Sequence, residues 1–125
     1  MDNQKNNQIR EERRKEPRAY VIFVEYYLEQ APLLKISTFA KNISSNGIGI
    51  LLAEDVKIDT TLFLKIHLLD GEKPIKVKAR VIWIEASSFL STKESKHFEA
   101  GLEYTDINDA DQARILGYVV RVLNR

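Results

Sequence analysis

The sequence predicts a small all-β domain, a six-stranded antiparallel barrel with one α-helix at its C-terminal end. Six short segments are rich in β-branched and aromatic residues or alternate between apolar and polar residues, which is typical of strands. Turn-forming residues rather than helical crossovers separate these segments, so we expect antiparallel neighbours. Only the last segment has helical periodicity. This combination favours a closed barrel with the helix docked on its outside.

The first three strands are predicted at 19–27, 33–44 and 47–52. The first is dense in β-branched and aromatic residues, which indicates that both of its faces are partly covered. Asn46-Gly47 predicts a tight turn before the third strand, because both residue types accept a positive φ.

The next three strands are predicted at 61–68, 75–85 and 98–104, where apolar and polar residues alternate. Alternation directs every second side chain toward the barrel interior. The core is therefore expected to include Leu64, Trp83 and Leu102. Asp70-Gly71 predicts the turn between the first two of these strands.

The last segment, 108–125, has the apolar spacing of an amphipathic helix. Its expected buried stripe consists of Ile115, Leu116, Val119, Val120 and Leu123. In the strand at 75–85, Ile82 and Ile84 interrupt the outward polar pattern. We expect the terminal helix to cover these two side chains.

Composition narrows the class of function. The chain has 125 residues, a formal net charge of +1 and no cysteine. One domain of ordinary size is therefore expected, without disulfides, thiol chemistry or general attraction to nucleic acid. His67 and His97 are isolated and lack the spacing of a metal site. Helix capping explains Asp106, Asp109 and Asp111 as well as a metal site would. We predict no catalysis, no metal and no cofactor.

The segment 1–18 is polar and carries one aliphatic residue. Such a segment buries too little apolar surface to offset the entropy of ordering, so we predict a flexible arm at 1–18 and a barrel with its helix at 19–125. The sequence shows neither the apolar core of a signal peptide nor a run long enough to cross a bilayer. We therefore expect a cytoplasmic protein without membrane insertion.

A cluster of arginines lies just before the first predicted strand: Arg13, Arg14 and Arg18. A guanidinium can bind guanine O6 and N7 through two hydrogen bonds, stack on a base, or pair with phosphate. Taken alone, such a cluster is more often a solvated basic arm, here softened by neighbouring glutamates.

A second polar group lies in the segment Asn42-Ile43-Ser44-Ser45-Asn46-Gly47. Alternation puts the side chains of Asn42 and Ser44 on one face, and Gly47 permits a tight turn that leaves room for a ligand. Amide and hydroxyl groups offer the donors and acceptors that the edge of a base requires. Taken alone, this segment is also typical of an ordinary strand-ending turn.

In this order, the two groups resemble the motifs of a PilZ domain. Residues 14–18 match R-x-x-x-R and residues 42–47 match N-x-S-x-x-G. The resemblance extends through "GIGI", "VIWIE", "EAGLEY" and the terminal helix, and so covers nearly the whole chain after Arg13. Arg10 and Arg14 also satisfy R-x-x-x-R, but Arg18 adjoins the first strand, as the family pattern requires.

The resemblance implies a barrel that binds the bacterial second messenger cyclic di-GMP. It implies that Arg14 and Arg18 hold guanine and phosphate from the arm, and that Asn42, Ser44 and Gly47 receive a guanine on the barrel. In PilZ domains the residue before R-x-x-x-R influences the number of ligands bound. Here this residue is Arg13, so we hypothesise that two stacked molecules bind per chain. A receptor of this kind would signal to a downstream protein, which the sequence does not name.

Two alternatives remain at this point. The first is a PilZ-like adaptor of motility or pilus machinery that contacts proteins without binding the nucleotide. The second is a small barrel that binds single-stranded nucleic acid through basic and aromatic residues. The near-neutral charge and the lack of a regular aromatic row on the outward faces rank nucleic acid last.

Overall fold

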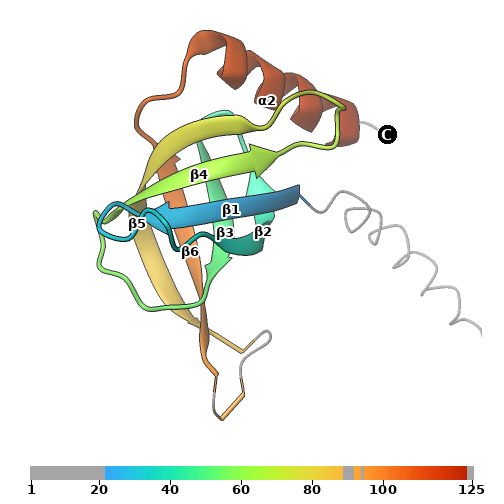
Figure 1. Ribbon diagram of the computed structural model, residues 1–125. Helices are drawn as coiled ribbons and strands as arrows, with labels where there is room; N and C mark the ends of the chain where they lie inside the picture. Colours follow the sequence, from blue (N-terminus) through green and yellow to red (C-terminus); the bar gives the residue numbers. More distant parts are fainter. Residues whose placement is uncertain (1–21, 89–91, 94, 124–125) are drawn as a thin grey trace, which may run out of the picture.

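The computed structural model describes residues 22–88, 92–93 and 95–123, and the predicted arm at 1–18 lies outside them. The elements are β1 (Ile22–Leu28), β2 (Ile36–Ile43), β3 (Gly47–Leu52), β4 (Thr61–His67), β5 (Ile75–Ser87), β6 (His97–Tyr104) and α2 (Asp109–Leu123). The strands close into a barrel in the order β1-β2-β3-β6-β5-β4 with antiparallel neighbours. Figure 1 shows α2 lying across one end of this barrel. The predicted fold class is confirmed.

The barrel interior is filled by the side chains that alternation directs inward. In β4 these are Leu62, Leu64 and Ile66, and all three are buried. Burial of such residues supplies the main driving force for folding, about 1.5–3 kcal/mol for each fully buried aliphatic side chain. Leu102 on β6 belongs to the same cluster, so two of the three predicted core positions are confirmed.

The prediction that Trp83 belongs to the core is wrong, because this residue is 43% exposed. The register between β5 and β6 shifts between Val81, which pairs with Leu102, and Trp83, which pairs with Gly101. A β-bulge of this kind inserts one extra residue and reverses the inside–outside alternation beyond it. Val81 therefore points into the barrel and Trp83 points out of it.

The buried stripe of α2 also differs from its prediction. Ile115 and Tyr118 are buried, and Val119 and Val122 pack against the core. This set follows the helical spacing i, i+3, i+4, i+7. Leu116 and Val120 were predicted to be buried but are 52% and 49% exposed. The side chain of Leu123 lies outside the described set. The helix is thus rotated so that Tyr118 rather than Leu116 and Val120 faces the barrel.

The helix does not cover Ile82 and Ile84, contrary to the prediction. Ile82 is 45% exposed, and Ile84 is partly buried against the barrel core. In Figure 1 the far ends of β5 and β6 extend away from α2, at the opposite end of the barrel. The break in alternation at Ile82 marks the β-bulge, not a helix contact.

The turns at the helix end of the barrel hold α2 in place. Arg114 donates hydrogen bonds to both carboxylate oxygens of Asp70, at 3.0 Å each, in the turn between β4 and β5. Gly71 in the same turn has a φ of 79°, as Asp70-Gly71 predicts. On the other side of the barrel, Gln112 donates to the carbonyl of Ser45 at 2.9 Å. Among the described residues, none of the helices has the length and apolar character needed to cross a membrane.

Candidate functional site

The predicted Asn-x-Ser-x-x-Gly segment forms the turn between β2 and β3. The Ser44 hydroxyl accepts hydrogen bonds from the backbone N–H groups of Asn46 and Gly47, both at 3.2 Å. The backbone N–H of Ser44 also donates to the carbonyl of Gly47 at 2.9 Å. A serine hydroxyl that accepts from N–H groups two and three residues onward stabilises a local turn. Ser44 therefore shapes the turn that carries the motif.

Gly47 is required at this turn by a close approach of two backbones. A Cβ at this position would collide with the carbonyl oxygen of Leu102 on the neighbouring strand β6. Within the described residues, positive φ angles occur only at Asp59 and Gly71. The predicted position of the turn is confirmed, but the predicted reason is wrong, because Gly47 provides space rather than a positive φ.

Four residues at paired positions form a row across the outside of the barrel. Asn42 on β2 pairs with Gly49 on β3, Gly49 pairs with Gly101 on β6, and Gly101 pairs with Trp83 on β5. The neighbours of both glycines along their strands point into the core. We call Asn42, Gly49, Gly101 and Trp83 the glycine row. Its two central positions have no side chain, and both glycines are buried between the side chains of the two end residues.

The two end residues of the glycine row lean over its glycines. A Cβ on Gly49 would lie 2.9 Å from Oδ1 of Asn42, and a Cβ on Gly101 would lie 2.6 Å from Cε2 of Trp83. The row thus presents an amide at one end and an exposed indole at the other. An indole can stack on a base, and an amide can bond to its edge. This arrangement suits a flat, hydrogen-bonding ligand.

Three of these four residues were not among the predicted site residues. Gly49 and Gly101 gave no signal beyond their presence within strands, where glycine often marks close approach of a ligand or another backbone. Trp83 was assigned to the core. The usable signal was the run Ile82-Trp83-Ile84, whose unbroken apolar character departs from alternation. A β-bulge there would have placed Trp83 outside.

The charged residues next to the glycine row are paired with one another. Arg80 donates to Glu103 at 2.6 Å and to Asp59 at 2.8 Å, and both carboxylates raise the pKa of this guanidinium. Lys41, at the bulge in β2, forms an ion pair of 2.7 Å with Glu99. Of the residues that the structure describes beside the row, both cations already have carboxylate partners. An anionic ligand would therefore need positive charge from elsewhere.

The structure brings together the three barrel residues that the sequence analysis assigned to a site. Asn42, Ser44 and Gly47 lie in and beside one turn, and Gly47 and Gly49 face the same side of β3. The three arginines of the prediction lie outside the described residues and stay a prediction: Arg13, Arg14 and Arg18. Within the described ranges, no group of three or more His, Asp or Glu side chains is placed to hold a metal ion.

Comparison with known proteins supplies the family. A model of the PilZ domain matches residues 12–121 of this sequence. The chain belongs to the PilZ family. The match includes both predicted motifs, and the closed barrel with its C-terminal helix agrees with the family fold. A comparison with curated proteins finds no match.

Several solved structures are similar to this chain. The Bacillus subtilis inhibitor of motility, MotI/DgrA, is 30% identical with a TM-score of 0.65, over 84% of this chain and 48% of that one. The PilZ domain of Escherichia coli YcgR, solved with c-di-GMP, is 13% identical with a TM-score of 0.59, over 84% and 82% of the chains. The MrkH–c-di-GMP complex of K. pneumoniae is 12% identical with a TM-score of 0.63, over 85% and 48%. This PilZ domain thus spans about half the length of MotI/DgrA and of MrkH.

Proposed function

We propose that this PilZ domain is a receptor for cyclic di-GMP and acts by binding rather than catalysis. The observation that carries the proposal is the position of the Asn-x-Ser-x-x-Gly turn directly beside the glycine row. The turn offers polar groups, and the row offers the exposed amide of Asn42 and the partly exposed indole of Trp83, which lie over its two buried glycines. Two related structures, YcgR and MrkH, were solved with c-di-GMP, which supports the same ligand class here.

The charges of the described face support a site made of two parts. Cyclic di-GMP carries two phosphates, whereas Lys41 and Arg80 beside the row are already paired with carboxylates. The barrel therefore provides shape and hydrogen bonds but little free positive charge. We infer that Arg14 and Arg18 of the N-terminal arm supply it, because guanidinium groups pair with phosphate and guanine through two hydrogen bonds each.

Binding at the turn has a direct route to the terminal helix. Gln112, near the start of α2, donates hydrogen bonds to the Ser45 carbonyl at 2.9 Å and to Oδ1 of Asn46 at 3.4 Å. Ser45 and Asn46 lie inside the motif. A ligand that changes the turn would change these bonds, and we infer that α2 and the arm together form the surface read by a downstream protein.

The number of ligands follows from the residue before R-x-x-x-R. Arg13 is a third guanidinium that could stack on a base or reach a second ligand's phosphates. Two stacked molecules bring four phosphate charges together, and an additional arginine would reduce their repulsion. We infer two molecules of cyclic di-GMP per chain.

Calorimetric titration of the full chain with cyclic di-GMP tests the proposal. At about 0.3 M salt, where phosphate contacts to nucleic acid are weakened, we expect saturable heat with cyclic di-GMP and much less heat with GMP or a short oligonucleotide at matched concentration. No heat at ligand concentrations of about 100 μM, well above the range of a functional receptor, would contradict the receptor and favour the adaptor alternative. A saturated ratio of one ligand per chain would contradict only the two-ligand inference, which Arg13→Leu tests further.

Arginine variants test the arm. Arg14→Ala or Arg18→Ala should weaken binding by about 1.5–3 kcal/mol, the range for hydrogen bonds to charged groups, without changing the thermal unfolding of the barrel. Arg10→Ala is the matched control because it also removes an arginine of the arm. If Arg10→Ala lowers the affinity and Arg18→Ala does not, the motif is shifted by four residues.

A further inference from the structure

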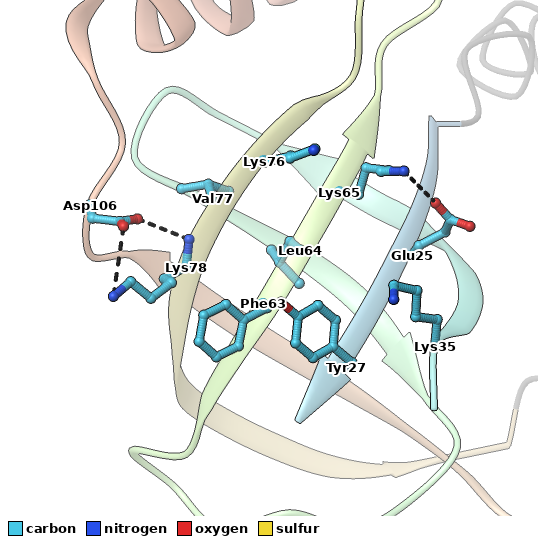
Figure 2. A pocket seen from close by; sticks show the side chains of 10 residues that line it. All are labelled: Glu25, Tyr27, Lys35, Phe63, Leu64, Lys65, Lys76, Val77, Lys78 and Asp106. Atoms are coloured by element: carbon cyan, nitrogen blue, oxygen red, sulfur yellow. Dashed lines mark hydrogen bonds and ion pairs between the residues drawn. The ribbon is translucent and has the colours of Figure 1, made fainter. Parts of the chain in front are cut away.

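A second surface, which shares only β5 with the glycine row, combines aromatic rings with lysines. Figure 2 shows this groove on the outside of β1, β4 and β5, with a volume of about 360 Å³. It is lined by Glu25, Tyr27, Lys35, Phe63, Lys65, Lys76, Lys78 and Asp106, together with Leu64 and Val77. We call it the lysine groove. Four ammonium groups and two carboxylates surround it, so its local charge is positive.

Two aromatic rings form one wall of the lysine groove. Tyr27 on β1 and Phe63 on β4 are cross-strand partners, and their rings are stacked with centroids 4.9 Å apart and planes 6° from parallel. The ammonium of Lys35 lies 5.3 Å from the Tyr27 ring centre, and that of Lys78 lies 5.8 Å from the Phe63 ring centre. These are loose cation–π contacts at partly exposed sites, which are weak. A flat ring could therefore replace either ammonium on the stack.

The opposite wall carries two lysines in direct cross-strand register. Lys65 on β4 pairs with Lys76 on β5. Like charges at directly opposite positions destabilise a sheet. Among the described residues, Glu25 is the one carboxylate within ion-pair distance of Lys65, at 3.8 Å, and Glu25 also contacts His67 at 3.2 Å. Within the described part of the chain, no carboxylate lies within ion-pair distance of Lys76. Folding gains nothing from this pair, whereas an anion placed between the two ammonium groups would relieve their repulsion.

We propose that the lysine groove binds a nucleotide unit, with its phosphate between Lys65 and Lys76 and its base stacked on the Tyr27–Phe63 pair. A phosphate has enough oxygens to bond both ammonium groups, and every base has a π-face that stacks on an aromatic side chain without regard to sequence. The ammonium displaced from the ring turns to the phosphate. An acidic peptide would use the lysines but would leave the aromatic wall without a role.

The nucleotide unit could belong to a single strand of nucleic acid or to a free nucleotide. The site is distinct from the proposed cyclic di-GMP site, which lies on β2, β3, β5 and β6. Nucleic acid ranked last among the predicted ligands because the sequence shows no regular aromatic row on the outward faces. Tyr27 and Phe63 are far apart in the sequence, and only the pairing of β1 with β4 makes them neighbours.

Fluorescence polarisation with a labelled oligothymidylate of about ten nucleotides tests the proposal at low salt, where phosphate contacts are strongest. The full chain carries Arg13→Ala, Arg14→Ala and Arg18→Ala, which removes the arginines assigned to the cyclic di-GMP site. We expect saturable binding that Lys76→Glu weakens by about tenfold or more, with a shallower dependence on salt. Lys57→Glu makes the same charge change at an exposed lysine outside the groove and should have less than about a twofold effect. Phe63→Leu keeps the site apolar but removes a ring, and should weaken binding about fivefold or more.

Competition by three unlabelled compounds identifies the chemical class of the bound ligand and its source. Unlabelled oligonucleotide must compete with the labelled one. If a free nucleotide such as AMP also competes, and Lys76→Glu weakens its binding to the same extent, the site binds free nucleotides as well. Competition by poly-glutamate equal to that of the oligonucleotide would overturn the proposal in favour of an acidic peptide. Equal losses in Lys76→Glu and Lys57→Glu, or no binding at all, would also overturn it. None of these outcomes depends on whether the unaltered chain binds cyclic di-GMP.

Discussion

The glycine row and the lysine groove are two parts of one barrel surface with opposite designs. The glycine row consists of two buried glycines beneath an amide and an indole, and the cations beside it, Lys41 and Arg80, are paired with carboxylates. The lysine groove has large side chains, a stacked aromatic pair and four lysines around two carboxylates. The first surface offers shape without charge, and the second offers charge without a tight shape.

This difference shows how a closed barrel can present separate sites. Closure satisfies the backbone hydrogen bonds of every strand and fills the interior with alternate side chains, so the outward residues are free to differ between faces. Helix α2 is tied to both faces, by Gln112 to the turn beside the glycine row and by Arg114 to the turn between β4 and β5. Four predictions test how independent the two faces are, from the largest expected effect to the smallest.

The largest expected change in stability distinguishes a residue of the barrel interior from a residue of the glycine row. Leu102→Ala should lower the free energy of unfolding by about 2–5 kcal/mol, because it removes a buried side chain and leaves a cavity. Trp83→Ala, one strand away, should cost less than Leu102→Ala, because Trp83 is 43% exposed and lies outside the barrel core, but it should weaken cyclic di-GMP binding. Urea unfolding and calorimetric titration measure the two effects. Equal destabilisation by both variants would show that Trp83 is a core residue.

The next prediction compares the loss of stability caused by alanine substitution at two glycines of β3. Gly47→Ala should destabilise the protein by about 1–3 kcal/mol, because its Cβ would meet the backbone carbonyl of Leu102, which moves only with the strand. Gly49→Ala should cost less, because its Cβ meets the exposed amide of Asn42, which can rotate away. Thermal unfolding of both variants measures the order, and the reverse order would show that the amide is held more firmly than the backbone.

The bond between Arg114 and Asp70 predicts a pH dependence. Burial acts to raise the pKa of Asp70, but the N–H of Glu72 and the Arg114 guanidinium outweigh it and hold the pKa below its ordinary 3.8. Because the folded state has the lower pKa, this carboxylate stabilises the fold above about pH 3.8 and loses its contribution as the pH falls further. The loss should be about 1 kcal/mol.

Urea unfolding between pH 3 and 6 measures this contribution, with Asp70→Asn as the variant that lacks the charge. The difference in stability between the unaltered chain and Asp70→Asn should shrink as the pH falls. Binding of cyclic di-GMP at neutral pH should not change in Asp70→Asn, since the turn lies away from the glycine row. A difference that stays constant with pH would assign the effect to packing rather than charge.

The smallest effect concerns the contact between α2 and the motif turn. Gln112→Ala removes the hydrogen bonds to Ser45 and Asn46 and should change stability by about 0.5–1 kcal/mol, because Gln112 is half-buried and neutral. It should lower cyclic di-GMP affinity a few-fold if the turn needs support from the helix. Arg114→Ala is the control, since it loosens the same helix at the other turn. Equal effects on affinity would show that α2 acts as a whole and not through Gln112.

Much of the fold could be predicted from local patterns. Alternation in β4 and β6 identified the inward side chains, because a strand with one buried face needs an apolar residue at every second position. Asp70-Gly71 identified its turn through the positive φ that glycine accepts. The motif at 42–47 identified the polar turn, because Ser44 and Gly47 act within a few residues of each other along the chain.

Other features depended on contacts between distant segments. The β-bulge that turns Trp83 outward is defined by the register of β5 against β6, and the glycine row exists only because four strands align Asn42, Gly49, Gly101 and Trp83. The rotation of α2 followed from which side chains fit the open end of the barrel, and the sequence pattern alone allowed Leu116 and Val120 as well as Tyr118. The lysine groove likewise required β1 to pair with β4 and β4 with β5. Local sequence determines which faces of a strand are apolar, but tertiary pairing decides which side chains become neighbours, because that choice rests on interactions between segments that the chain order does not bring together.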